Sequence, residues 1–260
     1  MLTACGQVGQ KVHACESDIA VAPFHCPACE GPVILKKGRF KIPLFAHEPG
    51  SLCTYGAGET IRHMELKLAI YEALKRSDAV GPQKCGIEMR LSIGSEFRIA
   101  DVLARIGPTL VAIEVQRSVI TEEEIRARTN FYTRKSIATL WVVARELQSL
   151  EYEGKPFRPN ATENAIHSMF LGRAYFHLTG STFVPVRFED SKYYVEAREW
   201  YSGGDEHSAG GYWATHKSLK LPKIDDPVDL LEDFEVHMCR ECRKQGQNSC
   251  PLLWMEKGAK

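Results

Sequence analysis

Two carboxylates in the middle of the chain have the setting expected of a site for a hard cation. Asp101 lies in the run Phe97 to Leu103, and Glu114 lies in the β-branched run Thr109 to Val115. An acid within an apolar strand costs desolvation free energy unless it is paired or binds a metal. Carboxylates on rigid neighbouring strands suit Mg²⁺ or Mn²⁺, and such a cation can activate water for phosphodiester hydrolysis. The sequence therefore predicts that Asp101 and Glu114 bind a catalytic cation. The alternative is a turn residue at Asp101 and a salt-bridged acid at Glu114.

Four further polar residues complete the candidate catalytic set. Gln116 lies two positions after Glu114, so both side chains project from one face of a strand. A glutamine can orient water, but it cannot supply the positive charge of a lysine. Glu59, His63 and Lys67 recur every four residues and form a polar stripe on a predicted helix. We expect Lys67 to supply the charge that Gln116 lacks; the alternative is a solvated helical lysine.

Cysteines near the start of the chain have the spacing of metal ligands. Cys26 and Cys29 form a CxxC pair, and Gly31 permits the tight turn that follows such a pair. His47 and Cys53 follow at separations that leave room for a short β-hairpin at 33–45. Together they offer three thiolates and one imidazole, a closed set typical of structural Zn²⁺. A group of reduced cysteines without metal is the alternative.

A second cluster of potential ligands lies near the end of the sequence. Its spacing allows a second Zn²⁺ with four ligands on one short segment. An iron–sulfur cluster is the rival, with Cys5, Cys15 or Cys85 as a fourth ligand, and free thiols are a third reading. The cluster consists of His237, Cys239, Cys242 and Cys250.

The segments that must position these residues alternate between helical and strand periodicity. Residues 59–76 lack Gly and Pro and place apolar residues on one helical face. Thr121 and Glu124 form a capping box that starts a second helix. Breaks at Pro49 to Gly58 and Tyr201 to Tyr212 suggest three parts, 1–58, 59–145 and 146–260. The predicted order in the middle part is helix 59–76, strands 87–93, 97–103 and 109–115, helix 121–135 and strand 140–143.

Composition leaves the class of partner open. The 260 residues include 33 Lys and Arg and 33 Asp and Glu, so DNA binding requires a local basic surface. Two basic segments offer one, a hairpin with Lys36, Lys37 and Arg39 and the helix that carries Arg128. The sequence shows neither a leader pattern nor an apolar run of about 18 residues, so we expect a cytoplasmic protein with no membrane partner.

Several of these motifs, taken in order, resemble the competence protein CoiA-like family. The resemblance covers about residues 24–145 and is specific because it rests on many short motifs in sequence. These are Cys26-x2-Cys29, Leu44-Phe45-Ala46-His47, Glu59-x3-His63-x3-Lys67, Arg98-Ile99-Ala100-Asp101-Val102, Ile113-Glu114-Val115-Gln116-Arg117-Ser118, Arg128-x3-Tyr132 and Leu140-Trp141-Val142-Val143.

The resemblance implies a fold and a chemistry. The fold is α/β, with a restriction-endonuclease-like core of the PD-(D/E)xK type (αβββαβ, a mixed sheet flanked by helices) behind a small zinc-binding hairpin unit. Asp101 and Glu114 would bind the catalytic metal, Gln116 would occupy the usual lysine position, and His63 and Lys67 would border the site. The family's ExQ form means that Gln116 is compatible with activity. Arg128 and Tyr132, with the basic hairpin, are the candidate contacts to nucleic acid.

The preferred hypothesis is a nuclease that hydrolyses DNA with Mg²⁺ or Mn²⁺, in competence-like DNA processing and recombination or in defence. A non-catalytic DNA-binding accessory protein of recombination that keeps the nuclease-like fold is the alternative. A zinc-stapled interaction module is a third. Partners in these hypotheses are DNA and either a second copy of the chain or recombination or defence proteins.

Overall fold

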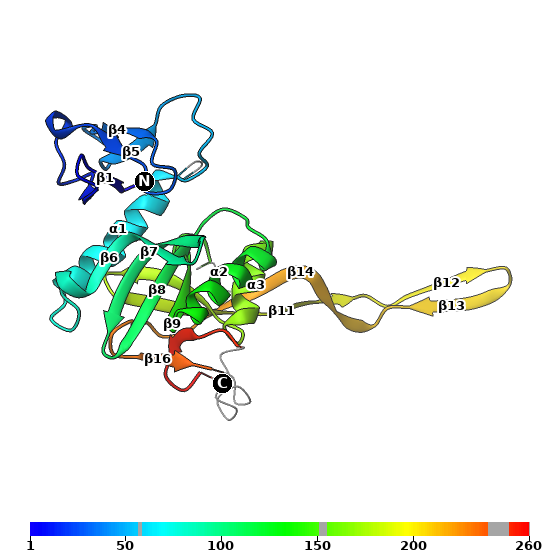
Figure 1. The fold of residues 1–260 in the computed structure, drawn as a ribbon. Coiled ribbons are helices and arrows are strands. Elements are labelled where there is room, and N and C mark those ends of the chain that lie inside the picture. Colours follow the sequence, from blue (N-terminus) through cyan, green and yellow to red (C-terminus); the bar gives the residue numbers. More distant parts are fainter. Residues whose placement is uncertain (57–58, 151–154, 239–249, 260) are drawn as a thin grey trace.

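The computed structural model describes residues 1–56, 59–150, 155–238 and 250–259 (Figure 1). The chain begins with a small antiparallel sheet in the order β2-β1-β3-β4-β5. Its own hydrophobic cluster includes Phe24, Val33 and Phe45. The expected hairpin is present as the antiparallel pair β4 and β5. The strands are β1 (Thr3–Cys5), β2 (Lys11–His13), β3 (Phe24–His25), β4 (Pro32–Lys36) and β5 (Leu44–His47).

The rest of the chain is organised around a large mixed sheet in the order β14-β11-β10-β9-β8-β7-β6. The pairs β6–β7 and β7–β8 are antiparallel, whereas β8–β9 and β9–β10 are parallel. The described strands are β6 (Cys85–Ile93), β7 (Glu96–Ile106), β8 (Thr109–Gln116), β9 (Ile137–Val143), β10 (Ala174–Thr179), β11 (Thr182–Val195) and β14 (Tyr212–Ile224), with β15 (Val228–Asp229), β16 (Phe234–His237) and β17 (Leu253–Glu256) attached beside them.

Three α-helices pack on this sheet: α1 (Ile61–Arg76), α2 (Glu122–Arg134) and α3 (Ala161–Met169). Thr60 caps α1 by accepting a hydrogen bond from the backbone of His63, and Thr121 caps α2 by accepting one from Glu124. Short 3₁₀ turns lie at Ile19–Val21, Pro82–Lys84 and Leu147–Ser149. The predicted order of a helix, three strands, a helix and a strand is present, with the last strand starting at Ile137 rather than Leu140.

The strands on either side of residue 145 belong to one sheet, because β9 pairs with β10 in parallel. Their apolar side chains form one large cluster, which includes Trp141, Tyr175 and Phe183. The division at residue 145 that composition suggested therefore runs through a single sheet.

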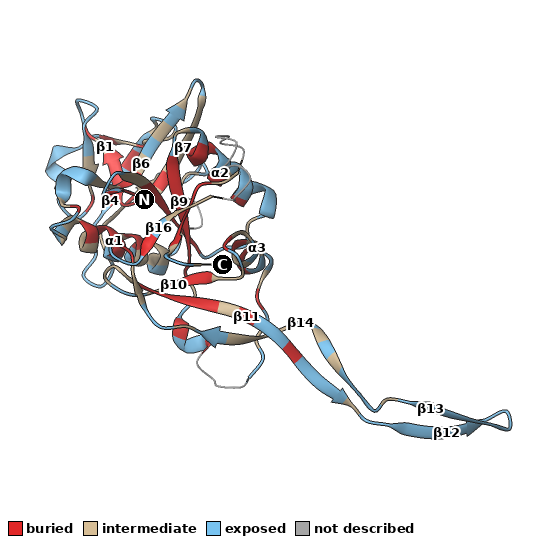
Figure 2. Ribbon diagram, turned by 90° about the horizontal axis from the view of Figure 1, so that it is seen from below, coloured by how far each residue is buried: buried red, intermediate tan, exposed pale blue. Residues whose placement is uncertain are grey.

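A long two-stranded arm projects from this body (Figures 1 and 2). β11 and β14 leave the sheet together and continue into β12 (Arg198–Ser202) and β13 (Asp205–Ala209). Gly203 and Gly204 form the tip with φ of +66° and +93°, which only glycine adopts readily. All residues of β12 and β13 are exposed. The sequence indicated only a Gly-rich break in this region.

Among the helices of the described residues, none is both long and apolar enough to cross a membrane.

Candidate metal and active site

Three acidic residues lie in one row across β6, β7 and β8. The flanking pairs in the β6–β7 register place Glu88 opposite Asp101. The pairing of β7 with β8 ends at Val102 and Ile113. Asp101 and Glu114 are the next residues on the two strands, which separate there. Glu88 and Glu114 are buried, and the Asp101 side chain is 15% exposed. The sequence predicted two of these acids; Glu88 is a third that it did not reveal.

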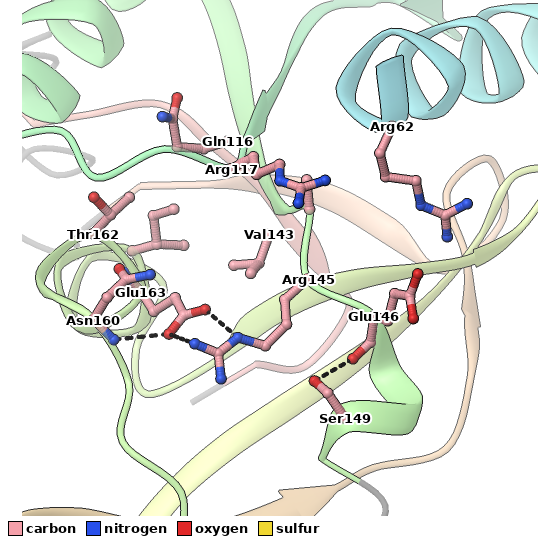
Figure 3. Close-up of a pocket in the computed structure, with 12 residues that line it drawn as sticks. Arg62, Gln116, Arg117, Val143, Arg145, Glu146, Ser149, Asn160, Thr162 and Glu163 are labelled. Atoms are coloured by element: carbon pink, nitrogen blue, oxygen red, sulfur yellow. Dashed lines mark hydrogen bonds and ion pairs between the residues drawn. The ribbon is translucent and has the colours of Figure 1, made fainter. Parts of the chain in front are cut away.

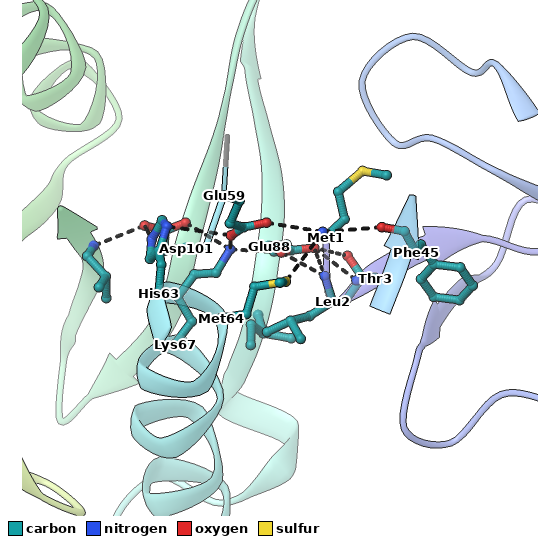
Figure 4. Close-up of polar contacts among 12 residues, drawn as sticks. Met1, Leu2, Thr3, Phe45, Glu59, His63, Met64, Lys67, Glu88 and Asp101 are labelled. Carbon is teal, nitrogen blue, oxygen red and sulfur yellow. Dashed lines mark hydrogen bonds and ion pairs between the residues drawn. The ribbon is translucent and has the colours of Figure 1, made fainter. Parts of the chain in front are cut away.

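The Asp101 carboxylate fills the opening between the two strands. Its Oδ2 accepts a hydrogen bond of 2.9 Å from the backbone N–H of Val115 and lies 3.5 Å from His63 Nε2. Its Oδ1 lies 3.4 Å from the Lys67 ammonium (Figure 4). The stripe of α1 that the sequence predicted therefore faces Asp101.

Lys67 lies among three carboxylates, and only 3% of its side chain is exposed. Its ammonium donates to Glu59 and, at 2.9 Å, to Glu88. Burial alone lowers the pKa of a lysine, but Glu88, Asp101 and Glu59 outweigh burial and hold the pKa of Lys67 above its usual value. Lys67 is therefore a permanent cation that neutralises part of a buried acidic cluster, and it is not a solvated helical lysine.

Glu88 fixes the first strand of the small sheet to the main body. Its carboxylate accepts hydrogen bonds of 2.9 to 3.0 Å from the backbone N–H groups of Leu2 and Thr3 and from the Thr3 hydroxyl. Burial alone would raise the pKa of Glu88, but the Lys67 ammonium, the Met1 ammonium and the backbone N–H of Leu2 lower it to about 2. Burial likewise opposes ionisation of Asp101, yet Lys67 and His63 hold the pKa of Asp101 well below its usual range. Both carboxylates are thus ionised at neutral pH.

Glu59, His63 and Asp101 form a group that fits a divalent cation. One potential ligand atom from each lies within 4.8 Å of the others. Nε2 of His63 is buried; Asp101 Oδ2 lies 3.5 Å from it, but among the described residues it makes no hydrogen bond. A buried polar atom without a hydrogen bond is unfavourable unless something else satisfies it, and the two carboxylates of this group are ligands that suit Mg²⁺ or Mn²⁺.

Glu114 is a salt-bridged acid in this structure, which is the alternative that the sequence left open, and its role as a metal ligand stays a prediction. It accepts hydrogen bonds from the Tyr132 hydroxyl and the Arg128 guanidinium of α2. Burial raises its pKa to about 7; Arg128 opposes this rise, and the neighbouring Asp101 carboxylate adds to it. Among the described residues, the group of three ligands around Asp101 does not include Glu114. Arg128 and Tyr132 hold this carboxylate, and their contact with DNA stays a prediction.

Gln116 turns away from the acidic row. Its amide nitrogen donates to the carbonyl and hydroxyl oxygens of Ser118, at 2.7 and 3.1 Å. The side chain also lines a cavity of about 340 Å³ beside Arg62 (Figure 3). Gln116 therefore lies at this cavity and not in the acidic row.

The four proposed zinc ligands come together in the small sheet. One atom each from Cys26, Cys29, His47 and Cys53 lies within 4.8 Å of all the others. Cys29 Sγ lies 3.4 Å from His47 Nε2. Three thiol groups and one imidazole fit Zn²⁺ because these ligand types occupy closed tetrahedral sites. The structure therefore provides a Cys₃His group that can bind zinc.

The backbone around the CxxC pair supports this group. The N–H of Ala28 points to Cys26 Sγ at 3.3 Å, and the N–H of Gly31 points to Cys29 Sγ at 3.4 Å. The Gly31 hydrogen bond, followed by that of His47, lowers the pKa of Cys29 to about 7. A Cβ at Gly31 would lie 3.3 Å from Cys29 Sγ, which explains the glycine.

The two basic segments differ in how many of their charged side chains form ion pairs. Lys36, Lys37 and Arg39 are exposed at the connection from β4 to β5. On α2, Arg126 pairs with Glu122 and Arg134 pairs with Glu96, so neither charge is free. The small sheet therefore carries the more available positive charge.

A groove of about 820 Å³ lies between the small sheet and the main body. Cys53 and Tyr55 line one side, and Phe97, Ile99 and Arg128 line the other. The groove thus passes from the proposed zinc ligands to the arginine that holds Glu114.

The C-terminal ligand cluster is described only at its ends. His237 ends β16, and Cys250 precedes β17. Cys239 and Cys242 lie outside the described residues, so a second zinc or an iron–sulfur cluster stays a prediction.

Comparison with known proteins confirms the resemblance. Residues 10–56 match the N-terminal domain of competence protein CoiA, and residues 59–175 match its nuclease-like domain. The chain is 29% identical over 121 residues to the competence protein CoiA of Bacillus subtilis (strain 168), an alignment that covers 46% of this chain and 31% of that relative. The chain thus matches about a third of the length of this curated relative, and no solved structure matches it. Because the two CoiA domains match successive regions that together span more than half of the sequence, the chain belongs to the CoiA-like family.

Proposed function

We propose that this protein is a metal-dependent nuclease that hydrolyses DNA phosphodiester bonds, with Mg²⁺ or Mn²⁺ bound at Asp101, in competence-like processing, recombination or defence. One observation carries the proposal. Asp101 lies at the opening between β7 and β8, within reach of Glu59 and of a His63 nitrogen that has no hydrogen-bond partner among the described residues. The match to a nuclease-like domain supports the same activity.

The residues around Asp101 have distinct roles in this proposal. A cation bound by Asp101, His63 and Glu59 would act as a Lewis acid and lower the pKa of a bound water. Lys67 keeps Asp101 ionised and ready to bind a metal. The N–H of Val115 fixes the orientation of the carboxylate, so little reorganisation is needed on binding. Lys67 and Val115 are thus positioning residues.

The DNA strand in this proposal follows the groove between the small sheet and the main body. Lys36, Lys37 and Arg39 supply exposed positive charge on the small sheet, which suits contacts to the phosphate backbone. Zn²⁺ at the Cys₃His group would hold the small sheet in shape, since a closed four-ligand site contributes folding free energy.

A DNA-binding accessory role without catalysis is the second candidate. It is favoured by the contacts of Glu114 and Gln116, because one is held by Arg128 and Tyr132 and the other by Ser118. In a two-carboxylate mechanism both would face the metal. The accessory protein would use the same basic surface and keep the acidic cluster for stability alone.

Cleavage of supercoiled plasmid and of labelled single strands separates the two candidates. Purified protein with Mn²⁺ is expected to cut at least one of these substrates, and Asp101→Asn is expected to abolish cutting because it removes a charged oxygen ligand. Arg198→Ala, on the arm, is the control for loss of a surface charge. No cutting by the wild-type protein with either Mg²⁺ or Mn²⁺ would favour the accessory role.

A further inference from the structure

A second polar cavity opens beside the acidic row, at the carboxyl ends of β8 and β9 (Figure 3). Its volume is about 340 Å³, within the usual range of pockets for small ligands. Arg117 follows the end of β8, Arg145 follows the end of β9, and Arg62 comes from the first turn of α1. Three guanidinium groups from three separate segments therefore line one cavity.

One of these arginines is already engaged. Arg145 forms a two-point ion pair with the buried carboxylate of Glu163, with Nε to Oε1 at 2.8 Å and Nη2 to Oε2 at 3.0 Å. The neutral lining groups are also engaged: Asn160 completes a capping box with Glu163, and Gln116 and Thr162 donate to nearby backbone oxygens. These contacts give the cavity a rigid floor.

Arg62 and Arg117 differ from these groups. Among the described residues, neither guanidinium has a hydrogen bond or ion-pair partner, and both side chains are exposed at the rim. Each offers a planar fork of N–H donors, the geometry that matches two oxygens of a phosphate. Glu146 is the one other charged lining residue that has no partner within the described chain. Its carboxylate reduces the positive charge of the rim without cancelling it.

Arg62 and Arg117 together with Glu146 give the rim a net charge of +1, so the number of its N–H donors, and not its charge, is what fits the end of a strand better than its interior. A terminal phosphomonoester carries about −1.5 to −2 at pH 7, whereas an internal phosphodiester carries about −1. The guanidinium groups of Arg62 and Arg117 can both donate to the oxygens of one terminal phosphate. A single internal phosphodiester would leave one of these two guanidinium groups without a partner. We propose that this cavity binds the terminal phosphate of a nucleic-acid strand.

The cavity and the acidic row share the same two elements. Arg62 is next to His63 on α1, Gln116 follows Glu114 on β8, and Arg117 comes directly after the end of β8. A strand whose end lies in the cavity therefore leaves it at the edge of the sheet that carries Asp101. This proposal rests on the proposed nuclease function for the identity of the ligand, and it narrows the substrate to phosphorylated ends.

The test measures binding, not cleavage, so that it is independent of catalysis. Fluorescence anisotropy measures binding of two pairs of labelled single strands. The first pair is labelled at the 3′ end and carries either a 5′ phosphate or a 5′ hydroxyl. The second pair is labelled at the 5′ end and carries either a 3′ phosphate or a 3′ hydroxyl. The full chain is used with its zinc retained and no other divalent ion added. For one of the two ends, the phosphorylated strand is expected to bind about tenfold more tightly than its hydroxyl form, as for charge-assisted hydrogen bonds.

Three variants and one control identify the site. Arg62→Ala and Arg117→Ala are each expected to reduce that preference severalfold, whereas Arg198→Ala, on the distant arm, is expected to keep it. Glu146→Gln is expected to increase it, because it removes the opposing charge. Equal binding of phosphorylated and hydroxyl strands at both ends by the wild-type protein would overturn the proposal. So would a uniform loss of affinity for all strands in the arginine variants, which indicates contact with internal phosphates only. Cleavage with Mn²⁺ by a protein that shows no preference for phosphorylated ends would support the nuclease function and contradict the proposed role of this cavity.

Discussion

The ammonium of Lys67 lies 2.9 Å from a carboxylate oxygen of Glu88, and the two side chains are only 3% and 1% exposed. This buried ion pair joins α1 to β6 directly beside Asp101. The sequence led us to expect that Lys67 supplies positive charge to the reaction. In the structure it contacts the carboxylates of Glu59, Glu88 and Asp101 and neutralises part of their charge, while its role in the reaction stays a prediction.

Removal of the Lys67 charge is expected to destabilise the fold. Lys67→Met keeps the apolar stem but leaves the buried carboxylate of Glu88 without its ion-pair partner, which costs about 3–5 kcal/mol by analogy with other broken buried pairs. Lys75→Met, on the same helix but 31% exposed, is the control and is expected to change stability by about 0.5 kcal/mol or less. Urea unfolding at pH 7 measures both. Equal effects of the two substitutions would contradict the buried-cluster interpretation.

Glu88 and Glu114 are expected to make opposite contributions to the pH dependence of stability. The pKa of Glu88 is lowered to about 2, so its contribution is present above the unfolded value of 4.5 and is lost as the pH falls from there towards 2. The pKa of Glu114 is raised to about 7, so its contribution is present below 4.5 and is lost as the pH rises through 7.

Glutamine substitutions separate the two contributions in urea unfolding between pH 3 and pH 8. Glu88→Gln is expected to reduce the acid-induced loss of stability and to destabilise the protein at pH 7. Glu114→Gln is expected to remove a decline between pH 5 and pH 7 and to cost little at pH 8. A Glu114→Gln variant with the wild-type slope between pH 5 and pH 7 would show that this carboxyl titrates normally in the fold.

The Cys₃His group is expected to hold one zinc ion per chain and to stabilise the small sheet. Cys29→Ser and Cys53→Ser each remove one of four ligands, so both should lower the bound zinc and the melting temperature. Cys15→Ser, an exposed cysteine outside the group, is the matched control. Metal analysis by mass spectrometry, together with thermal unfolding, checks this. Full zinc content in both ligand variants would show that the Cys₃His group does not bind the zinc.

The nuclease-like part of the fold could be predicted because its signals are local. A few neighbouring residues are enough to indicate each element. They are the apolar stripe of α1, the continuous apolar run of β8 and the Thr121 cap of α2. The grouping of Cys26, Cys29, His47 and Cys53 could be predicted because their spacing along the sequence is distinctive.

The partners within the site could not be predicted, because they depend on distant segments. Alternation along β6 placed Glu88 with the polar residues, but a φ of +50° at Glu88 breaks the alternation and buries both Ile87 and Glu88. The donors to Glu88 come from residues 2 and 3, about 85 positions away. For Glu114 the sequence predicted burial in an apolar strand, but nothing local showed that Arg128 and Tyr132 would hold it.

Binding of Mn²⁺ to the full chain, followed by electron paramagnetic resonance of the free ion, tests the central claim most directly. With Asp101, His63 and Glu59 as ligands, Asp101→Asn is expected to weaken Mn²⁺ binding by at least about tenfold, because it removes ligand charge. Glu114→Gln is expected to leave the affinity almost unchanged, because that carboxylate is held by Arg128 and Tyr132. Wild-type affinity in Asp101→Asn, or an equal loss in both variants, would contradict the account.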